Sequence, residues 1–149
     1  MLPATLPSSR AAAARPRSRP ASSTLVSVVV EYRVGPLDLI PERGGILAVA
    51  GDVEVGVFRL DGELRAYENR CRHQGGPVCT GEILGRYEAV LNPDGTIAGE
   101  RVVDAEPRLV CPWHGWEYDL STGRCASDRR FSLKRYQVSV RAGEVYVHV

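Results

Sequence analysis

Two short segments carry the residues of this chain that are best suited to bind a metal. Cys71 is followed two positions later by His73, and Cys111 is followed three positions later by His114. Each segment offers one thiolate and one imidazole, and the glycines beside each segment indicate loops. Thiolate and imidazole bind zinc, and they also bind the iron of iron–sulfur clusters. The pattern therefore predicts a metal centre between two loops.

The pairing of one Cys with one His in each segment favours one particular iron centre. In a Rieske 2Fe-2S cluster, two thiolates bind one iron and two imidazoles bind the other. The neutral imidazoles make the centre less negative and easier to reduce, at roughly −150 to +300 mV against about −400 mV for all-Cys plant-type clusters. We therefore expect a Rieske-type 2Fe-2S cluster whose ligands are Cys71, His73, Cys111 and His114.

A structural zinc site is the alternative interpretation, because two Cys and two His also satisfy tetrahedral zinc. Zinc motifs usually pair Cys-x-x-Cys with His-x(3–5)-His, and the spacing in this chain differs. A zinc-stabilised interaction module is therefore the less favoured reading of the same four residues.

The residues around the ligands resemble a known family. Residues 71–77 read CRHQGGP and residues 111–119 read CPWHGWEYD. Both strings resemble the cluster-binding boxes of Rieske ferredoxins, in particular the ferredoxin components of bacterial ring-hydroxylating oxygenase systems. The resemblance implies an antiparallel β-sandwich in which two loops hold the cluster at one tip. It also implies that both His ligands face solvent, where a redox partner docks.

Flanking positions distinguish this chain from the cytochrome bc type of Rieske protein. In that type, a second Cys in each box forms a disulfide between the loops, whereas those positions here are Gly76 and Trp113. That type also has a serine, which donates a hydrogen bond to the cluster, where this chain has Trp116. Fewer donors stabilise the reduced charge less, so we expect a potential in the lower part of the Rieske range.

The resemblance implies a one-electron carrier that delivers electrons from a reductase to a terminal oxygenase. The chain has only three His, so it cannot add the two-His-one-carboxylate iron site with which larger Rieske oxygenases activate oxygen. We therefore expect an electron-transfer component that is not itself an enzyme. The small Rieske subunit of an NADH-dependent nitrite reductase is the alternative.

Short runs with alternating polarity and turn signals predict an all-β domain over residues 25–149. Asp61-Gly62 and Ala142-Gly143 predict tight hairpins. The segment between His73 and Cys111 is longer than in the ferredoxins that the chain resembles, and Asn92-Pro93-Asp94-Gly95 lies within it, so we expect a hairpin insertion over residues 85–108. The predicted strands are Leu25–Val34, Ile46–Ala50, Val53–Leu60, Leu64–Glu68, Glu88–Leu91, Arg101–Asp104, Trp116–Asp119, Gln137–Arg141 and Glu144–Val149.

Composition limits the other classes of function. The 149 residues suit one domain, and the formal net charge of +1 gives no indication of a nucleic-acid or membrane partner. No run approaches the ~20 apolar residues of a membrane-spanning helix. Residues 1–24 are rich in Arg, Ala, Ser and Pro without any acid, which predicts a disordered tail, with an organelle transit peptide as the alternative. We expect a cytoplasmic protein in which Cys79 and Cys125 are buried, reduced thiols.

Overall fold

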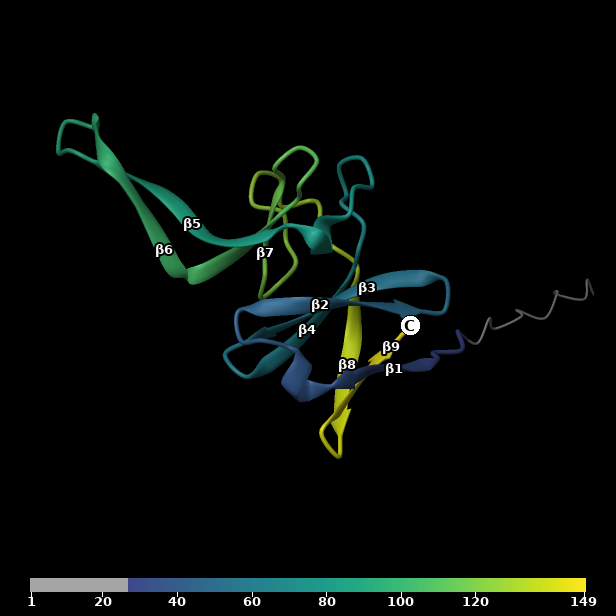
Figure 1. The fold of residues 1–149 in the computed structure, drawn as a ribbon. Coiled ribbons are helices and arrows are strands. Elements are labelled where there is room, and N and C mark those ends of the chain that lie inside the picture. The colour runs from purple at the N-terminus through teal and green to yellow at the C-terminus, as the bar shows by residue number, and fades with distance from the viewer. Residues whose placement is uncertain (1–26) are drawn as a thin grey trace, which may run out of the picture.

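The computed structural model describes residues 27–149, so the tail predicted over residues 1–24 lies outside the described residues. The described chain forms nine strands and two single-turn 3-10 helices (Figure 1). In chain order the elements are β1 (Glu31–Pro36), η1 (Leu37–Leu39), β2 (Gly44–Ala50), β3 (Val53–Leu60), β4 (Glu63–Glu68), η2 (Val78–Thr80), β5 (Glu82–Leu91), β6 (Ile97–Val110), β7 (Glu117–Asp119), β8 (Arg135–Arg141) and β9 (Glu144–His148).

The strands form two antiparallel sheets. One has six strands in the order β1-β9-β8-β4-β3-β2, and the other has three in the order β5-β6-β7. The all-β prediction is confirmed, and each predicted strand overlaps an observed one. The prediction for the first strand begins at Leu25, which lies outside the described residues; of the described part, Val28 and Val29 are exposed and precede β1, which begins at Glu31.

Two tight turns connect strands as their sequences predict. Asp61 and Gly62, between β3 and β4, have φ values of 52° and 76°. Ala142 and Gly143, between β8 and β9, have φ values of 49° and 75°. Positive φ at both central residues is the conformation that matches the twist of the flanking strands. These turns fix the registers of β3 with β4 and of β8 with β9.

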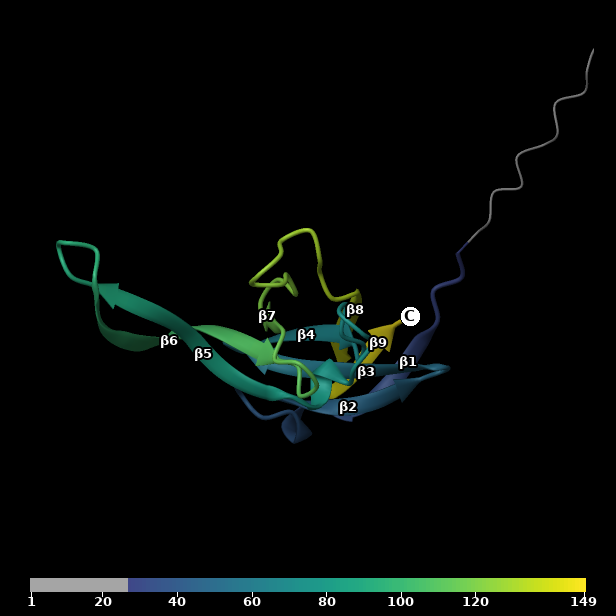
Figure 2. The ribbon, with the colours of Figure 1, turned by 90° about the horizontal axis from the view of Figure 1, so that it is seen from above.

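The long segment between the two predicted metal-binding loops folds as a β-hairpin, here called the arm (residues 82–110). In both views it extends away from the six-stranded sheet (Figures 1 and 2). A turn at Asn92–Thr96 joins β5 to β6, and Asp94 Oδ1 accepts a hydrogen bond from the Thr96 N–H at 2.9 Å. The predicted hairpin insertion is therefore confirmed. Both strands are longer than expected, and β6 runs up to the residue before Cys111.

The pairing of the arm is interrupted near its base. Gly85 lies opposite Pro107, whereas the next residue, Arg86, lies opposite Val103. Three residues of β6 are therefore unpaired, a bulge of the kind that bends a ribbon. Arg43 donates to the carbonyl of Asp104 in this bulge at 2.7 Å. This hydrogen bond attaches the bend to the segment that precedes β2.

The buried side chains form two groups. One lies within the six-stranded sheet and includes Val55, Val57, Val145 and Val147. The other lies under the two Cys/His loops, and its members are Phe58, Tyr67, Cys71, Val78, Cys79, Leu109, Cys111, Tyr118, Leu120, Cys125 and Leu133. The second group includes Cys71 and Cys111, so it packs against the base of the two loops. Among residues 27–149, no helix has the length and apolar character needed to cross a membrane.

Candidate metal centre

The two predicted metal-binding loops adopt the same backbone conformation. In loop 1 (residues 71–76), the Cys71 N–H donates to the Gly76 carbonyl at 2.7 Å, and the Gly75 N–H donates to the Cys71 carbonyl at 2.9 Å. In loop 2 (residues 111–116), the Cys111 N–H donates to the Trp116 carbonyl at 2.8 Å, and the Gly115 N–H donates to the Cys111 carbonyl at 3.0 Å. Two equivalent turns therefore present the predicted ligands.

A glycine makes each turn possible. Gly75 has a φ of 77° and Gly115 a φ of 71°. This left-handed conformation suits glycine and costs an L-residue free energy. The glycines beside the ligands therefore have a geometric role.

The four predicted ligands form two pairs that differ in burial. Cys71 and Cys111 are 4% and 2% exposed, whereas His73 and His114 are exposed. The two imidazole rings meet edge to face, with their centroids 4.8 Å apart. Within residues 27–149, no three His, Cys, Asp or Glu side chains converge on one point closely enough for a single ion. The arrangement fits a centre with one sulfur-ligated and one nitrogen-ligated iron.

Aromatic side chains fix the position of His73. The Trp116 ring is stacked on the imidazole, with centroids 4.6 Å apart and an interplanar angle of 10°. Trp116 also contacts Phe131, at a centroid distance of 5.8 Å. This stacking orients the imidazole of a predicted ligand.

Tyr118 of β7 reaches the sulfur of Cys71. Its hydroxyl lies 3.2 Å from Cys71 Sγ and accepts a hydrogen bond from the Arg72 N–H at 3.1 Å. Burial raises the pKa of Tyr118 above its ordinary value, so the hydroxyl keeps its proton near neutral pH. Because the oxygen already accepts from Arg72, its proton is free to point at the sulfur.

The sequence did not predict this contact. Alternation along Glu117-Tyr118-Asp119 does indicate that Tyr118 faces inward, opposite to its neighbours. It does not indicate which of the buried groups the hydroxyl meets, because Cys71 lies 47 residues away in the chain.

Backbone amides also face a predicted ligand. Burial raises the pKa of the Cys111 thiol, and the adjacent Cys71 thiol raises it further. Hydrogen bonds from the N–H groups of Trp113 and His114 act in the opposite direction and favour the thiolate. Such donors stabilise a negative sulfur ligand, so loop 2 suits a bound thiolate.

The remaining two cysteines are buried away from the loop tips. Cys79 is 8% exposed and Cys125 is 1% exposed, and neither forms a disulfide. The Cys79 Sγ approaches the carbonyl of Tyr67 at 3.6 Å. The prediction that both cysteines are buried is therefore confirmed.

Comparison with known proteins agrees with this geometry. Residues 31–137 match the family described as the Rieske 2Fe-2S domain. The chain belongs to this family. Its cofactor is thus a Rieske 2Fe-2S cluster, and it is an electron-transfer protein of the all-β Rieske fold. Both the predicted family and the predicted cofactor are confirmed.

One curated relative of this Rieske protein is the human Rieske domain-containing protein, which is 34% identical over 90 residues, covering 60% of the chain and 46% of the relative. The chain spans less than half the length of the curated relatives it matches, and the glycine betaine monooxygenase oxygenase subunit of Chromohalobacter salexigens is covered over only 16% of its length.

Solved structures share the fold at low sequence identity. The NADH-dependent nitrite reductase small subunit from Mycobacterium tuberculosis gives a TM-score of 0.60 at 21% identity, with 82% of this chain and 96% of that chain covered. The ferredoxin of carbazole 1,9a-dioxygenase from Nocardioides aromaticivorans gives 0.55 at 21% identity, with 78% and 95% covered. A carbazole 1,9a-dioxygenase oxygenase and ferredoxin complex gives 0.56 at 22% identity, with 78% and 28% covered.

Proposed function

We propose that this Rieske protein is a one-electron carrier between a reductase and a terminal oxygenase, and that Cys71, His73, Cys111 and His114 ligate its cluster. When bound, the cluster accepts one electron and gives it up again with little rearrangement. The observation that carries the proposal is the contrast between two buried thiols and two exposed, adjacent imidazoles. The thiols hold the centre in the fold, and the imidazoles bring it within reach of a partner.

The surroundings of the imidazoles support docking of a partner protein at this tip. Arg72, Gln74 and Trp113 are all exposed, and Trp113 is 57% exposed despite its size. Exposed aromatic and arginine side chains are typical of protein interfaces. We propose that these three residues contact the reductase and the oxygenase in turn. The shared fold of a carbazole dioxygenase ferredoxin, and a solved complex of such an oxygenase with its ferredoxin, are consistent with this role.

We propose that the protein is a carrier without substrate chemistry of its own. The third histidine, His148, lies in β9, where its Nε2 is 2.9 Å from Ser139 Oγ. It is thus held in the six-stranded sheet, apart from the two loops. We also place the carrier in the cytoplasm, because four cysteines without a disulfide suit a reducing compartment.

A second candidate function is the small subunit of a nitrite reductase. It is favoured by the likeness to such a subunit over nearly its whole length. The two functions differ in whether the protein is stably bound to a larger catalytic partner in the cell. A subunit co-elutes with a large catalytic partner when native extract is fractionated by size, whereas a free carrier elutes alone.

The ligand assignment is tested by electron paramagnetic resonance of the dithionite-reduced protein. A cluster with two His and two Cys ligands gives a lower average g value than an all-Cys cluster. His114→Cys is expected to lower the potential or to prevent cluster assembly, because a thiolate adds negative charge. His148→Gln is the matched control and is expected to keep the native spectrum. An unchanged spectrum and potential in His114→Cys would remove His114 from the ligands.

A further inference from the structure

One side of the arm is a free strand edge. Within residues 27–149, β5 pairs with β6 alone, and the arm extends away from the six-stranded sheet (Figures 1 and 2). The other side of the arm is less suited to further pairing, because β6 has the bulge at residues 104–106 and pairs with β7 at its base. A free edge has unpaired N–H and C=O groups, so a further strand can pair with β5.

One face of β5 has a pattern that is complementary to itself. Side chains two positions apart share a face, so Arg86 and Glu88 lie on the same face, with Leu84 before them and Val90 after them. Leu84 is 39% exposed and Val90 is 40% exposed. From either end, this face presents an apolar residue, two opposite charges and an apolar residue. A copy of β5 that runs in the opposite direction therefore matches it.

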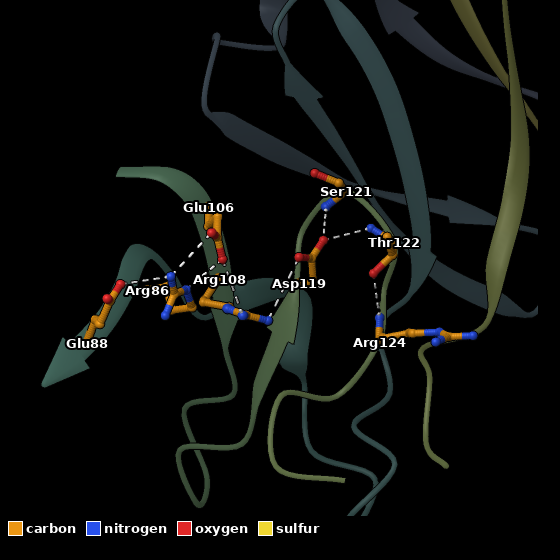
Figure 3. Close-up of polar contacts among 8 residues, drawn as sticks. All are labelled: Arg86, Glu88, Glu106, Arg108, Asp119, Ser121, Thr122 and Arg124. Atoms are coloured by element: carbon orange, nitrogen blue, oxygen red, sulfur yellow. Dashed lines mark hydrogen bonds and ion pairs between the residues drawn. The ribbon is translucent and has the colours of Figure 1, made fainter. Parts of the chain in front are cut away.

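Ion pairs within the arm hold the two charged side chains of this face. Arg86 Nη2 lies 2.9 Å from Glu88 Oε2, and Arg86 Nε lies 2.6 Å from Glu106 Oε2 (Figure 3). The hydrogen bond to Glu106 raises the pKa of Arg86, and the hydrogen bond from Arg101 lowers the pKa of Glu88. Both groups are therefore charged near neutral pH. Each side chain is still 32% exposed and has sites left for a further charged contact.

Few registers allow β5 to pair with a copy of itself about a two-fold axis. Side chains directly opposite each other share a face, so the axis passes between one residue and its own copy. The registers that pair more than half of the 10 residues of β5 have the axis at Gly85, Arg86, Tyr87 or Glu88. An axis at Gly85 places Glu82 opposite Glu88, and an axis at Arg86 or Glu88 places that residue opposite itself. Like charges directly opposite each other are unfavourable, which leaves the axis at Tyr87.

The register with its axis at Tyr87 matches both the charged and the apolar residues. It places Arg86 of each copy opposite Glu88 of the other. It also places Leu84 of each copy opposite Val90 of the other, so that exposed apolar side chains cover each other. On the opposite face the two Tyr87 rings meet at the axis, where each is 61% exposed in the single chain. Cross-strand pairs of opposite charge and of apolar side chains both stabilise a sheet.

We propose that the protein forms a two-fold symmetric dimer in which the β5 strands of two copies pair antiparallel, with the axis at Tyr87. The occupant of the free edge is a second copy of this chain, because the charges of β5 are complementary to themselves in this register. The interface consists of one pair of strands, so the association is weak and reversible. It uses none of the predicted cluster ligands and does not depend on the proposed electron-carrier function.

Sedimentation velocity of the cluster-loaded full chain, at one fixed ionic strength, tests the dimer. We expect a shift from monomer to dimer as the protein concentration rises, and a chain that stays monomeric up to about 0.1 mM overturns the proposal. Tyr87→Lys places two like charges at the axis and is expected to weaken the dimer about tenfold. Val102→Lys is the matched control, because Val102 lies directly opposite Tyr87 but on β6, whose edge the dimer does not use. Equal weakening by both variants, or by neither, would contradict pairing through β5.

Charge reversal tests the register. Arg86→Glu leaves two negative charges on the face, and Glu88→Arg leaves two positive ones, so each variant meets only like charges in its own copy. Each is expected to self-associate about tenfold more weakly than the native chain. A mixture of the two variants places opposite charges at both contacts again, and dimers are expected to return. A mixture that associates no better than either variant alone would show that the strands do not pair in this register.

Discussion

A β-carbon on Gly76 would lie 2.7 Å from Cδ2 of Trp113, so these two residues are in close contact between loop 1 and loop 2. They occupy the positions at which the cytochrome bc type has its disulfide. In this chain, the indole of Trp113 packs against the backbone of Gly76 at the place where that type has a disulfide bridge. The contact needs glycine for its lack of a side chain, because Gly76 does not have a positive φ.

Gly76→Ala is therefore expected to push the two loops apart. The crowding involves the base of the indole rather than its far edge, and overpacking of this kind costs about 1–3 kcal/mol. We expect faster loss of the cluster absorbance on warming. Gly99→Ala on the arm is the control, because its new methyl group would meet nothing within 4 Å. In a Trp113→Ala background, Gly76→Ala should have little effect, and an undiminished effect would contradict the steric explanation.

Tyr118→Phe is expected to lower the reduction potential. It removes a hydroxyl 3.2 Å from Cys71 Sγ, and a hydrogen bond to a ligating sulfur stabilises the more negative, reduced state. If the hydrogen bond is stronger in the reduced than in the oxidised state by about 1 kcal/mol, its loss lowers the one-electron reduction potential by an amount on the order of tens of millivolts. Protein-film voltammetry measures the shift. Tyr146→Phe on β9 is the control, and equal potentials in all three proteins would show that the hydroxyl does not affect the cluster.

Cys79 is expected to resist alkylation in the native protein. Burial raises its pKa from 9.0 to about 12, so the neutral thiol is favoured and the thiolate appears only as the pH approaches that value. At pH ~8.5 its thiolate fraction is on the order of a thousandfold below that of an ordinary cysteine. Mass spectrometry after iodoacetamide treatment should find Cys79 unmodified in the native protein and modified in denaturant. Similar rates in both conditions would show that Cys79 is accessible.

The outer part of the arm is expected to be dispensable for cluster binding. Tyr87 and Val102 lie directly opposite each other, so an Asn-Gly turn can join them in place of residues 88–101. These residues are largely exposed and lie beyond the bulge, away from the loops. We expect an unchanged visible spectrum and a thermal midpoint within a few degrees of the full chain. A colourless product would mean that the arm supports the loops.

The sequence predicted the features that depend on local chemistry. Asp61-Gly62 specified its turn because both positions require positive φ, and the spacing of Cys71 and His73 indicated a candidate metal site directly. It did not predict the length of β6, because Glu106-Pro107 interrupts the alternation just where the strand continues past the bulge.

The arm has one further consequence for the protein in solution. The outer edge of β5 pairs with no strand among residues 27–149, and Tyr87, Leu91 and Ile97 on one face of the ribbon are 61%, 59% and 69% exposed. Such an edge is a template for strand addition by another molecule. The ion pair of Glu88 with Arg101, at 2.9 Å on the opposite face, makes a flat stack of ribbons unfavourable. Salt screens those charges, so concentrated salt is the condition in which arm-to-arm aggregation should begin.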